Sequence, residues 1–315
     1  MKKFFYIFSA IIIISGLAVL IFIKKQDKTV SFFTFPHSYN YVATHFEKEE
    51  IEVEIFLNRN DALLTNRQAV AEVWITDSER ENVLPLKLLS IENNDNKLTV
   101  NEETYYGYDY IFEVELVTET DFEFLLSEAY LGLELRNGEV IFLKLGSFSL
   151  YKIFGFGSEE LSVSHLQGIV NKIDDVKTLV GICFTLKNKT SAEITVTDLK
   201  VFSQILHPAL SDIIFPEAKT IKSGEDIQEL IGSYNPYKVE VGNINFTIKP
   251  KSEVKILLPL KYKTLLPVKE LGFIVEYELK GEIRNLYFNE FTFFTDYEFP
   301  LGLINDLEIQ THDNY

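Results

Sequence analysis

The sequence of 315 residues lacks several features that commonly stabilise or mark exported domains and enzymes. It contains one cysteine, Cys183, so no intramolecular disulfide can form and an apolar core has to hold the fold. The five histidines are scattered and show none of the short spacings of zinc sites. Neither a Gly-x-Ser-x-Gly elbow nor a glycine-rich phosphate loop is present. We therefore expect a protein without a cofactor or a resident metal, and one that is not an enzyme.

Positive charge is also scarce. The chain has 30 lysines and arginines against 47 acidic residues, a net charge of −17 at pH 7. Residues 1–25 contain four of the lysines and no acid, so the remainder is more acidic still. Such a surface repels the phosphates of nucleic acids and anionic lipid headgroups. We expect no nucleic-acid partner, and the charge in itself needs no role beyond solubility.

One long hydrophobic run stands out, at the N-terminus. Phe4–Ile23 carries no charge and is flanked by lysine pairs. A helix of this length spans about 30 Å, the thickness of the hydrocarbon layer of a bilayer. No small-residue cleavage site or lipoprotein cysteine follows it, although a cleaved signal peptide is the alternative. We predict that residues 1–28 form a transmembrane anchor whose partner is the lipid bilayer.

The orientation of this anchor is not set by its flanking lysines, which nearly balance. A long acidic domain behind an N-terminal anchor is usually exported. We therefore expect a single-pass protein of the cell membrane, with its C-terminal body extracytoplasmic and with a bacterial character, since exported chains with so little cysteine are bacterial in habit.

After Lys28 the pattern changes to short alternating runs. In Ile51–Leu57 the apolar residues fall on one face and the acids on the other, which predicts a half-buried strand. The same alternation occurs in Ala71–Thr76, Ile111–Leu116 and Leu131–Leu135. Asparagine-rich segments between such runs, Asn58–Asp61 and Asn93–Asn96, are predicted turns. These elements predict a first β-sandwich domain over residues 29–153.

A second set of strands is expected in residues 158–300, after glycines that interrupt the pattern near residue 155. Ser223–Gly232 is predicted as a short helix, and residues 301–315 as an acidic C-terminal tail. The expected strands of this second β-sandwich are Leu179–Leu186, Glu193–Val201, Asn243–Ile248, Lys255–Leu260, Leu271–Leu279 and Ile283–Phe294.

Two segments are similar to each other. When Gly138 is aligned with Gly281, the residues that follow match through Phe148 and Phe291, and each segment is predicted as a hairpin with a glycine turn. The alternative is that any two hairpins align this well, since a single pair falls short of a true repeat.

The second region also resembles exported bacterial immunoglobulin-like domains. The resemblance lies in Leu179–Val201, Ile248–Ile256 and Gly272–Tyr287, where short Lys-Asn, Pro-Lys-Ser and Lys-Gly turns separate the strands. The Cys…Trp…Cys pattern of antibody domains is absent. The resemblance implies a fold and no activity. The predicted fold class is all-β, with two tandem immunoglobulin-like β-sandwich domains behind a single N-terminal transmembrane helix.

Few residues qualify as functional candidates. Cys183 lies within a predicted strand and is expected to be a buried structural thiol. Glu92–Asn96 resembles the calcium-binding linker motif of cadherins, but Lys97–Thr99 breaks the motif, and an ordinary turn is the preferred interpretation. A candidate binding surface is formed by the tyrosines, which alternatively pack on their own sheet: Tyr105, Tyr106, Tyr108, Tyr110, Tyr234 and Tyr237.

The sequence is compatible with three functions. We favour a non-enzymatic, membrane-anchored binding or assembly module that contacts a protein or polymer of the cell envelope. The first alternative is an envelope hydrolase or transferase with an unrecognised carboxylate pair, drawn from loops such as Asp174-Asp175 or Asp212. The second alternative is a structural spacer.

Overall fold

The computed structural model describes residues 29–44, 48–114, 120–153, 159–216, 235–237, 242–288 and 307–313. The predicted anchor (1–28), the predicted helix Ser223–Gly232 and Tyr234 lie outside the described residues. In the described ranges, no helix has the length and apolar character needed to cross a membrane.

The described chain is all-β, as the alternating sequence predicts. Its only helical elements are three short 3-10 turns, η1 (Leu63–Thr65), η2 (Arg67–Ala69) and η3 (Leu210–Asp212). The strand over Glu50–Leu57 shows why the prediction holds: Ile51, Val53 and Ile55 are buried, while Glu50 and Glu52 are exposed. Aromatic and β-branched side chains, abundant in this sequence, suit such a pleated surface.

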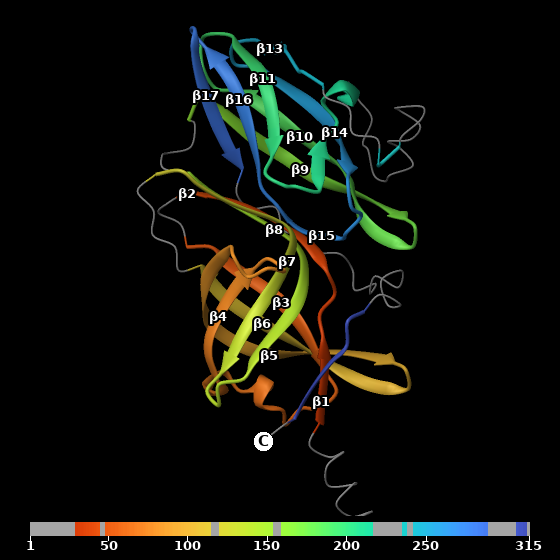
Figure 1. The fold of residues 1–315 in the computed structure, drawn as a ribbon. Coiled ribbons are helices and arrows are strands. Elements are labelled where there is room, and N and C mark those ends of the chain that lie inside the picture. Colours follow the sequence, from red (N-terminus) through yellow and green to blue (C-terminus); the bar gives the residue numbers. More distant parts are fainter. Residues whose placement is uncertain are drawn as a thin grey trace, which may run out of the picture.

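The first body is one curled sheet of ten strands (Figure 1). A single core contains side chains from β1 to β8, so the sheet must wrap around it. This differs from the expected pair of separate facing sheets, because the strands form one continuous ladder. In sheet order the strands are β15 (Val268–Leu271), β2 (His37–Thr44), β8 (Val140–Ile153), β7 (Phe122–Leu135), β4 (Val70–Thr76), β5 (Val83–Val100), β6 (Glu103–Val114), β3 (Glu50–Leu57), β1 (Thr29–Phe33) and β18 (Gln310–Asp313).

The β1–β18 end of this sheet reaches the first half of β8. Strand β2 pairs with β8 only from Gly146 onward, which leaves the earlier residues of β8 without a ladder to β2. Side chains from the opposite end of the sheet reach this edge: Thr34 donates to the carbonyl oxygen of Lys144 at 2.6 Å, and Gln310 donates to that of Phe142. Side-chain hydrogen bonds thus replace a ladder and close the curled sheet.

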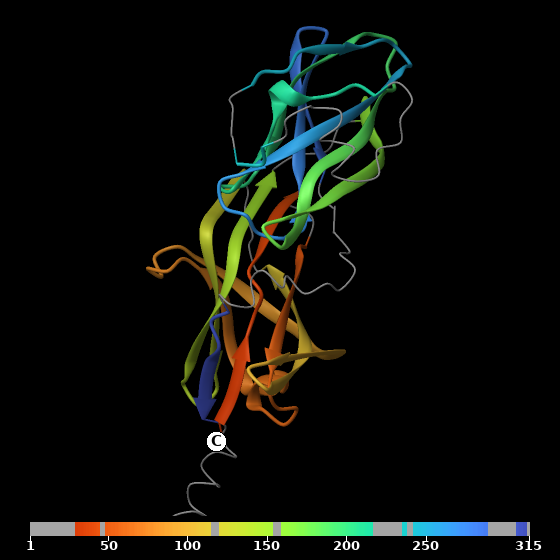
Figure 2. The ribbon, with the colours of Figure 1, turned by 90° about the vertical axis from the view of Figure 1, so that its right-hand side faces the viewer.

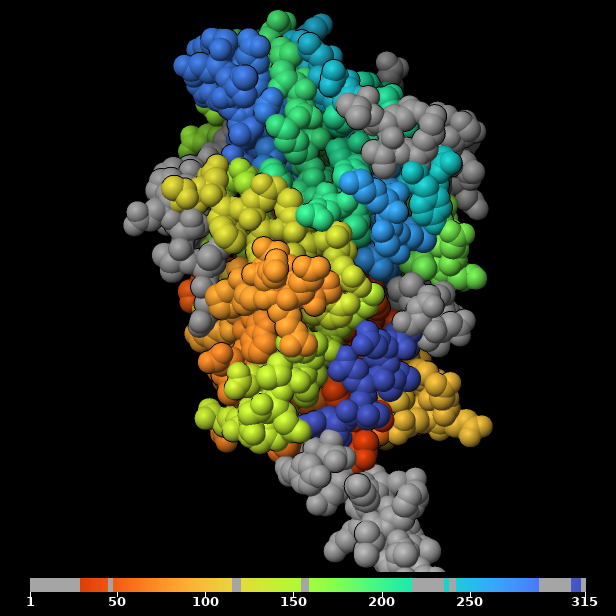
Figure 3. All heavy atoms as spheres, viewed as in Figure 1, coloured from red at the N-terminus to blue at the C-terminus, as the bar shows by residue number. Residues whose placement is uncertain are grey.

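The C-terminal segment is part of this body. Residues 310–313, expected within an acidic tail, form β18, which pairs antiparallel with β1 from Thr29↔Asp313 to Phe32↔Gln310. In Figure 3 this dark-blue strand lies against the first body, next to the red start of the described chain. Leu307 and Ile309 also pack on a small aromatic cluster around Phe33 and Phe56.

The second body is a β-sandwich. One sheet has the order β12 (Leu206–Pro208), β14 (Glu253–Tyr262), β10 (Val176–Asn188) and β9 (Leu161–Ile173). The other has the order β13 (Phe246–Ile248), β11 (Ile194–Val201), β16 (Phe273–Leu279) and β17 (Glu282–Phe288). Both sheets contribute to one apolar core, in which the Phe184 and Phe273 rings lie 5.4 Å apart.

The hairpins predicted at the two aligned glycines are present. Gly138 follows β7 and Gly281 lies between β16 and β17, with φ angles of 88° and 84°. Only glycine adopts this region without strain, which explains its presence in both turns.

The two bodies are joined by strand pairing as well as by the chain. Strand β15 falls in the predicted second domain, yet it pairs parallel to β2 at the edge of the first sheet. Tyr151 also stacks on Phe202, with ring centroids 4.0 Å apart. Figure 2 shows the resulting elongated arrangement, with the sandwich above the curled sheet.

Candidate functional site at the opening between β4 and β5

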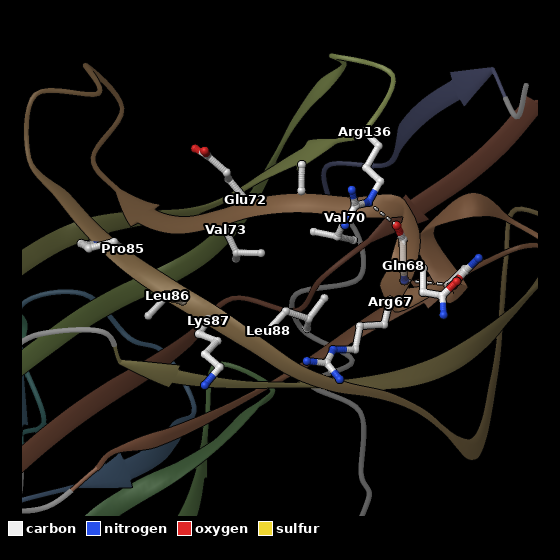
Figure 4. A pocket seen from close by; sticks show the side chains of 12 residues that line it. Arg67, Gln68, Val70, Glu72, Val73, Pro85, Leu86, Lys87, Leu88 and Arg136 are labelled. Carbon is white, nitrogen blue, oxygen red and sulfur yellow. Dashed lines mark hydrogen bonds between the residues drawn. The ribbon is translucent and has the colours of Figure 1, made fainter.

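The wall of the first body has an opening between β4 and β5. Strands β4 and β5 pair antiparallel from Thr76↔Val83 to Val73↔Leu86, and there the ladder ends. Beyond this point β4 remains paired with β7, and β5 with β6. The two strands therefore part while their outer partners hold them in place, as Figure 4 shows.

Local irregularities explain why the strands separate. The β4–β7 ladder shifts register between Val70 and Glu72, and the β5–β6 ladder shifts between Leu88 and Ser90. Bulges of this kind bend a strand and increase its twist, so two of them turn β4 and β5 away from each other.

The opening contains a cavity of about 770 Å³, within the range of ligand sites. Its floor is the edge of the core, formed by Val70, Val73, Leu86 and Leu88. These side chains keep 5–9% exposure, whereas Ile75 and Leu84, where the ladder is closed, keep 0–1%. The cavity is therefore floored by buried apolar side chains at the edge of the core.

The rim of the opening is basic, in contrast to the acidic protein as a whole. Arg67, Lys87 and Arg136 line it, against a single acid, Glu72. Arg136 donates to the carbonyl oxygen of Gln68 at 2.6 Å, and Lys87 lies 3.7 Å from a carboxylate oxygen of Glu113. The guanidinium of Arg67 makes no hydrogen bond or ion pair with any described residue and extends from η2 toward β5 (Figure 4).

A second cavity, of about 700 Å³, lies on the outer face of the β9–β10–β14 sheet. Cys183 contributes to its wall but is only 2% exposed, as expected for a structural thiol. Burial raises the pKa of this thiol, which opposes formation of the nucleophilic thiolate.

Of the tyrosines predicted as a binding surface, three of the four in β6 are buried in the structure, which disagrees with an exposed role for them. Tyr105, Tyr108 and Tyr110 are buried in β6, and their hydroxyls are satisfied within the protein by Glu103, Asn60 and Leu64. Tyr106 is half-buried. These side chains pack on their own sheet because they belong to its buried strands.

Tyr237 is the exception, with 46% exposure. It belongs to a different region, where its hydroxyl donates to Asp174 at 2.5 Å. Asp174 and its neighbour Asp175 are exposed in the turn between β9 and β10, and Asp212 lies 3.5 Å from Lys261. None of the three aspartates lines either cavity.

The structure reveals a carboxylate pair that the sequence did not. Glu54 of β3 and Asp109 of β6 are direct cross-strand partners. The amide nitrogen of Asn94 bridges them, at 2.7 Å from Glu54 and 2.8 Å from Asp109, and Asn96 adds a second donor to Glu54 at 2.7 Å. Burial raises the pKa of both carboxyl groups, and neither lines either cavity.

This cluster corrects the prediction of a turn at Asn93–Asn96. The segment is a bulge inside β5: Asn93 pairs with Tyr108 and Lys97 with Tyr106. Gly107 makes room for it, since a Cβ there would lie 2.4 Å from the side-chain oxygen of Asn94. Amide donors, rather than metal-binding oxygens, face the carboxylates, and the described residues contain no group of three or more candidate metal ligands.

Comparison with known proteins adds little. No family model matches the chain, and no curated protein matches it. The solved structure named BspA_C_WT is similar over 82% of this chain and 99% of its own, with 9% identity and a TM-score of 0.21. A protein of unknown function from Porphyromonas gingivalis W83 is similar over 82% of this chain and 97% of its own, with 10% identity and a TM-score of 0.19.

The C-terminal domain of the Streptococcus pyogenes antigen I/II-family protein AspA is similar over 83% of this chain and 99% of its own, with 8% identity and a TM-score of 0.16. Scores of this size carry no argument about fold or function. The candidate site therefore rests on the geometry of this chain alone.

Proposed function

We propose that this chain is a non-enzymatic, membrane-anchored binding module of the cell envelope, built from a curled-sheet body and an immunoglobulin-like β-sandwich, and that it binds a protein partner at the β4–β5 opening. The opening carries the proposal because it combines an apolar floor at the edge of the core with a cationic rim on an acidic protein. Central apolar contacts surrounded by polar groups are the usual arrangement of a protein interface.

The chemistry of the opening supports binding over catalysis. Its lining has three cations and one carboxylate, without the facing acid pair that glycoside hydrolysis requires. The carboxylate pair of Glu54 and Asp109 lies on another part of the sheet and accepts hydrogen bonds from an asparagine amide.

The fold also supports placement of the opening near a membrane. Strand β1 begins at Thr29, directly after the predicted anchor, and the C-terminal strand β18 lies beside it. The β16–β17 hairpin is at the opposite end of the molecule (Figure 1). With residues 1–28 in the bilayer, the curled sheet lies close to the membrane and the sandwich points away from it.

Site-specific crosslinking in intact cells tests the binding function. Ala71 is exposed and lines the opening, so a photoreactive residue placed there should yield one discrete adduct with a partner, identifiable by mass spectrometry. Lys249, exposed on the sandwich, is the matched control position and should yield none. Failure of Ala71 to exceed Lys249 would reject a partner at the opening and favour the spacer.

Energy transfer to labelled lipid tests the membrane placement. A dye at the C-terminus of the full chain in lipid nanodiscs should transfer efficiently to acceptors in the bilayer, and a dye at Gly281 should not. Equal transfer from both positions would contradict an anchor in residues 1–28 next to β1.

A further inference from the structure

We infer that the β4–β5 opening receives an extended segment of a partner protein in which apolar and acidic residues alternate, and that this segment adds to β5 as an extra strand. The inference rests on the proposed function and specifies the chemistry of the partner. Three independent observations support it: a free strand edge, the alternation along β5, and the charge of the rim.

The first observation is the edge of β5 itself. Strand β5 runs to Val100, and β6 pairs with one edge from Leu86 onward. On the edge that faces β4, no described strand pairs with β5 beyond Leu86. Backbone N–H and C=O groups need hydrogen-bond partners, and an extended peptide supplies them by adding a strand.

The second observation is the alternation of side chains along β5. Leu84, Leu86 and Leu88 are buried toward the core, whereas Pro85 and Lys87 are exposed. A strand added beside this part of β5, before the register shift after Leu88, has to follow the same period of two. Its inward residues would cover Val70 and Leu88 on the floor, so they should be apolar.

The third observation concerns the outward residues of the added strand. They would lie level with Lys87 and between Arg67 and Arg136. These cations stand out on a chain with a net charge of −17, which repels acidic segments elsewhere on its surface. Complementary charge steers association and fixes register, so acidic outward residues are selected at this opening.

Binding of a defined peptide to the full chain in phosphatidylcholine nanodiscs tests the inference. The probe is a labelled, end-capped peptide of eight residues that alternates valine and glutamate, followed by fluorescence anisotropy. We expect saturable binding that weakens about tenfold in Arg67→Glu and with added salt, since a rim attraction becomes a repulsion. Lys249→Glu, the same reversal far from the opening, should leave the affinity unchanged.

Two altered peptides separate the parts of the inference. Replacement of glutamate by lysine should abolish binding if the rim selects acids. N-methylation of alternate residues removes main-chain donors while keeping every side chain, and it should also abolish binding. An N-methylated peptide that binds as well as the parent would overturn strand addition, and an unchanged affinity in Arg67→Glu would overturn the charge selection.

The outcome also distinguishes this inference from the proposed function. If the alternating peptide fails to bind while the Ala71 adduct forms in cells, the opening has a partner of different chemistry and the inference is wrong. If concentration-dependent dimers of the chain crosslink through Ala71, the occupant is a second copy, which likewise overturns it. Loss of the Ala71 adduct in Arg67→Glu cells would support it.

Discussion

The side-chain amide of Asn40 donates a hydrogen bond of 3.2 Å to the backbone carbonyl oxygen of Glu270, across 230 positions of sequence. The backbone of Asn40 also accepts from the N–H of Gly272 at 2.5 Å. These contacts hold β15 parallel to β2, at the edge of the first sheet. A buried asparagine therefore helps to hold the sandwich on the curled sheet.

Replacement of this asparagine should loosen the junction. Asn40→Ala removes the bond to Glu270 and a second one to Ser38, of 3.0 Å. We expect the free energy of unfolding to fall by about 2 kcal/mol, since each net hydrogen bond contributes about 1 kcal/mol. Urea titration followed by tryptophan fluorescence and by circular dichroism measures this loss. Asn243→Ala, at an exposed position, is the control, and equal midpoints for the two variants would contradict the prediction.

Removal of the C-terminal strand should destabilise the first body. Deletion of residues 307–315 removes the β18 ladder on β1, the side-chain bond of Gln310 to β8, and the cover that Leu307 and Ile309 give to Phe33 and Phe56. The expected results are a lower melting temperature and increased binding of an apolar dye. Deletion of residues 314–315 alone leaves β18 in place and should change neither quantity. A stable, dye-negative product of the longer deletion would show that β18 is dispensable.

Stability should depend on the protonation of His37. Burial, with a smaller effect of Lys269, lowers the pKa of His37 from 6.5 to about 4. The unfolded chain binds a proton at this histidine near its ordinary pKa of about 6.5, whereas the folded chain does so only near pH 4. The contribution of neutral His37 to stability is therefore complete above pH 6.5 and is lost as the pH falls through about 4. In His37→Gln the free energy of unfolding should fall less steeply between these pH values. The control is His165→Asn, at an exposed position, in which the free energy of unfolding should fall with pH as in the wild type. The same fall in His37→Gln would contradict the prediction.

The Glu54–Asp109 pair should make stability depend on pH in the direction opposite to that of His37. Burial raises the pKa of both carboxyl groups, so the folded state holds their protons more tightly than the unfolded state does. Their contribution is present at acid pH, below the unfolded-state values, and is lost as the pH rises through the raised folded-state values.

The double variant Glu54→Gln/Asp109→Asn should therefore gain stability relative to wild type as the pH rises above about 4, where the carboxyls of the unfolded chain ionise. Thermal melts across this range measure the difference. A constant difference between the two proteins would contradict it. We also expect no effect of calcium on either protein, because amide nitrogens already occupy the carboxylates; a calcium-dependent rise in the wild-type melting temperature alone would reveal a metal site.

The sequence by itself determined the local elements of this protein. Alternation of apolar and acidic residues placed the strand at Ile51–Leu57, because a period of two exposes one face to water. The glycines at 138 and 281 marked two turns, because their positive φ excludes most other residues. Both signals lie within a few residues of sequence, so neither requires knowledge of the rest of the chain.

Only the tertiary structure decided which strands became neighbours. Alternation shows that a face is buried but does not identify the strand beside it, so the places of β15 and β18 in the first sheet had no local signal. For the same reason Asn93–Asn96 read as a turn, whereas Gly107 on the neighbouring strand accommodates it as a bulge. The candidate site is likewise non-local: pairing of β7 with β4 brings Arg136 beside the segment that carries Arg67, and Lys87 reaches the same opening from β5.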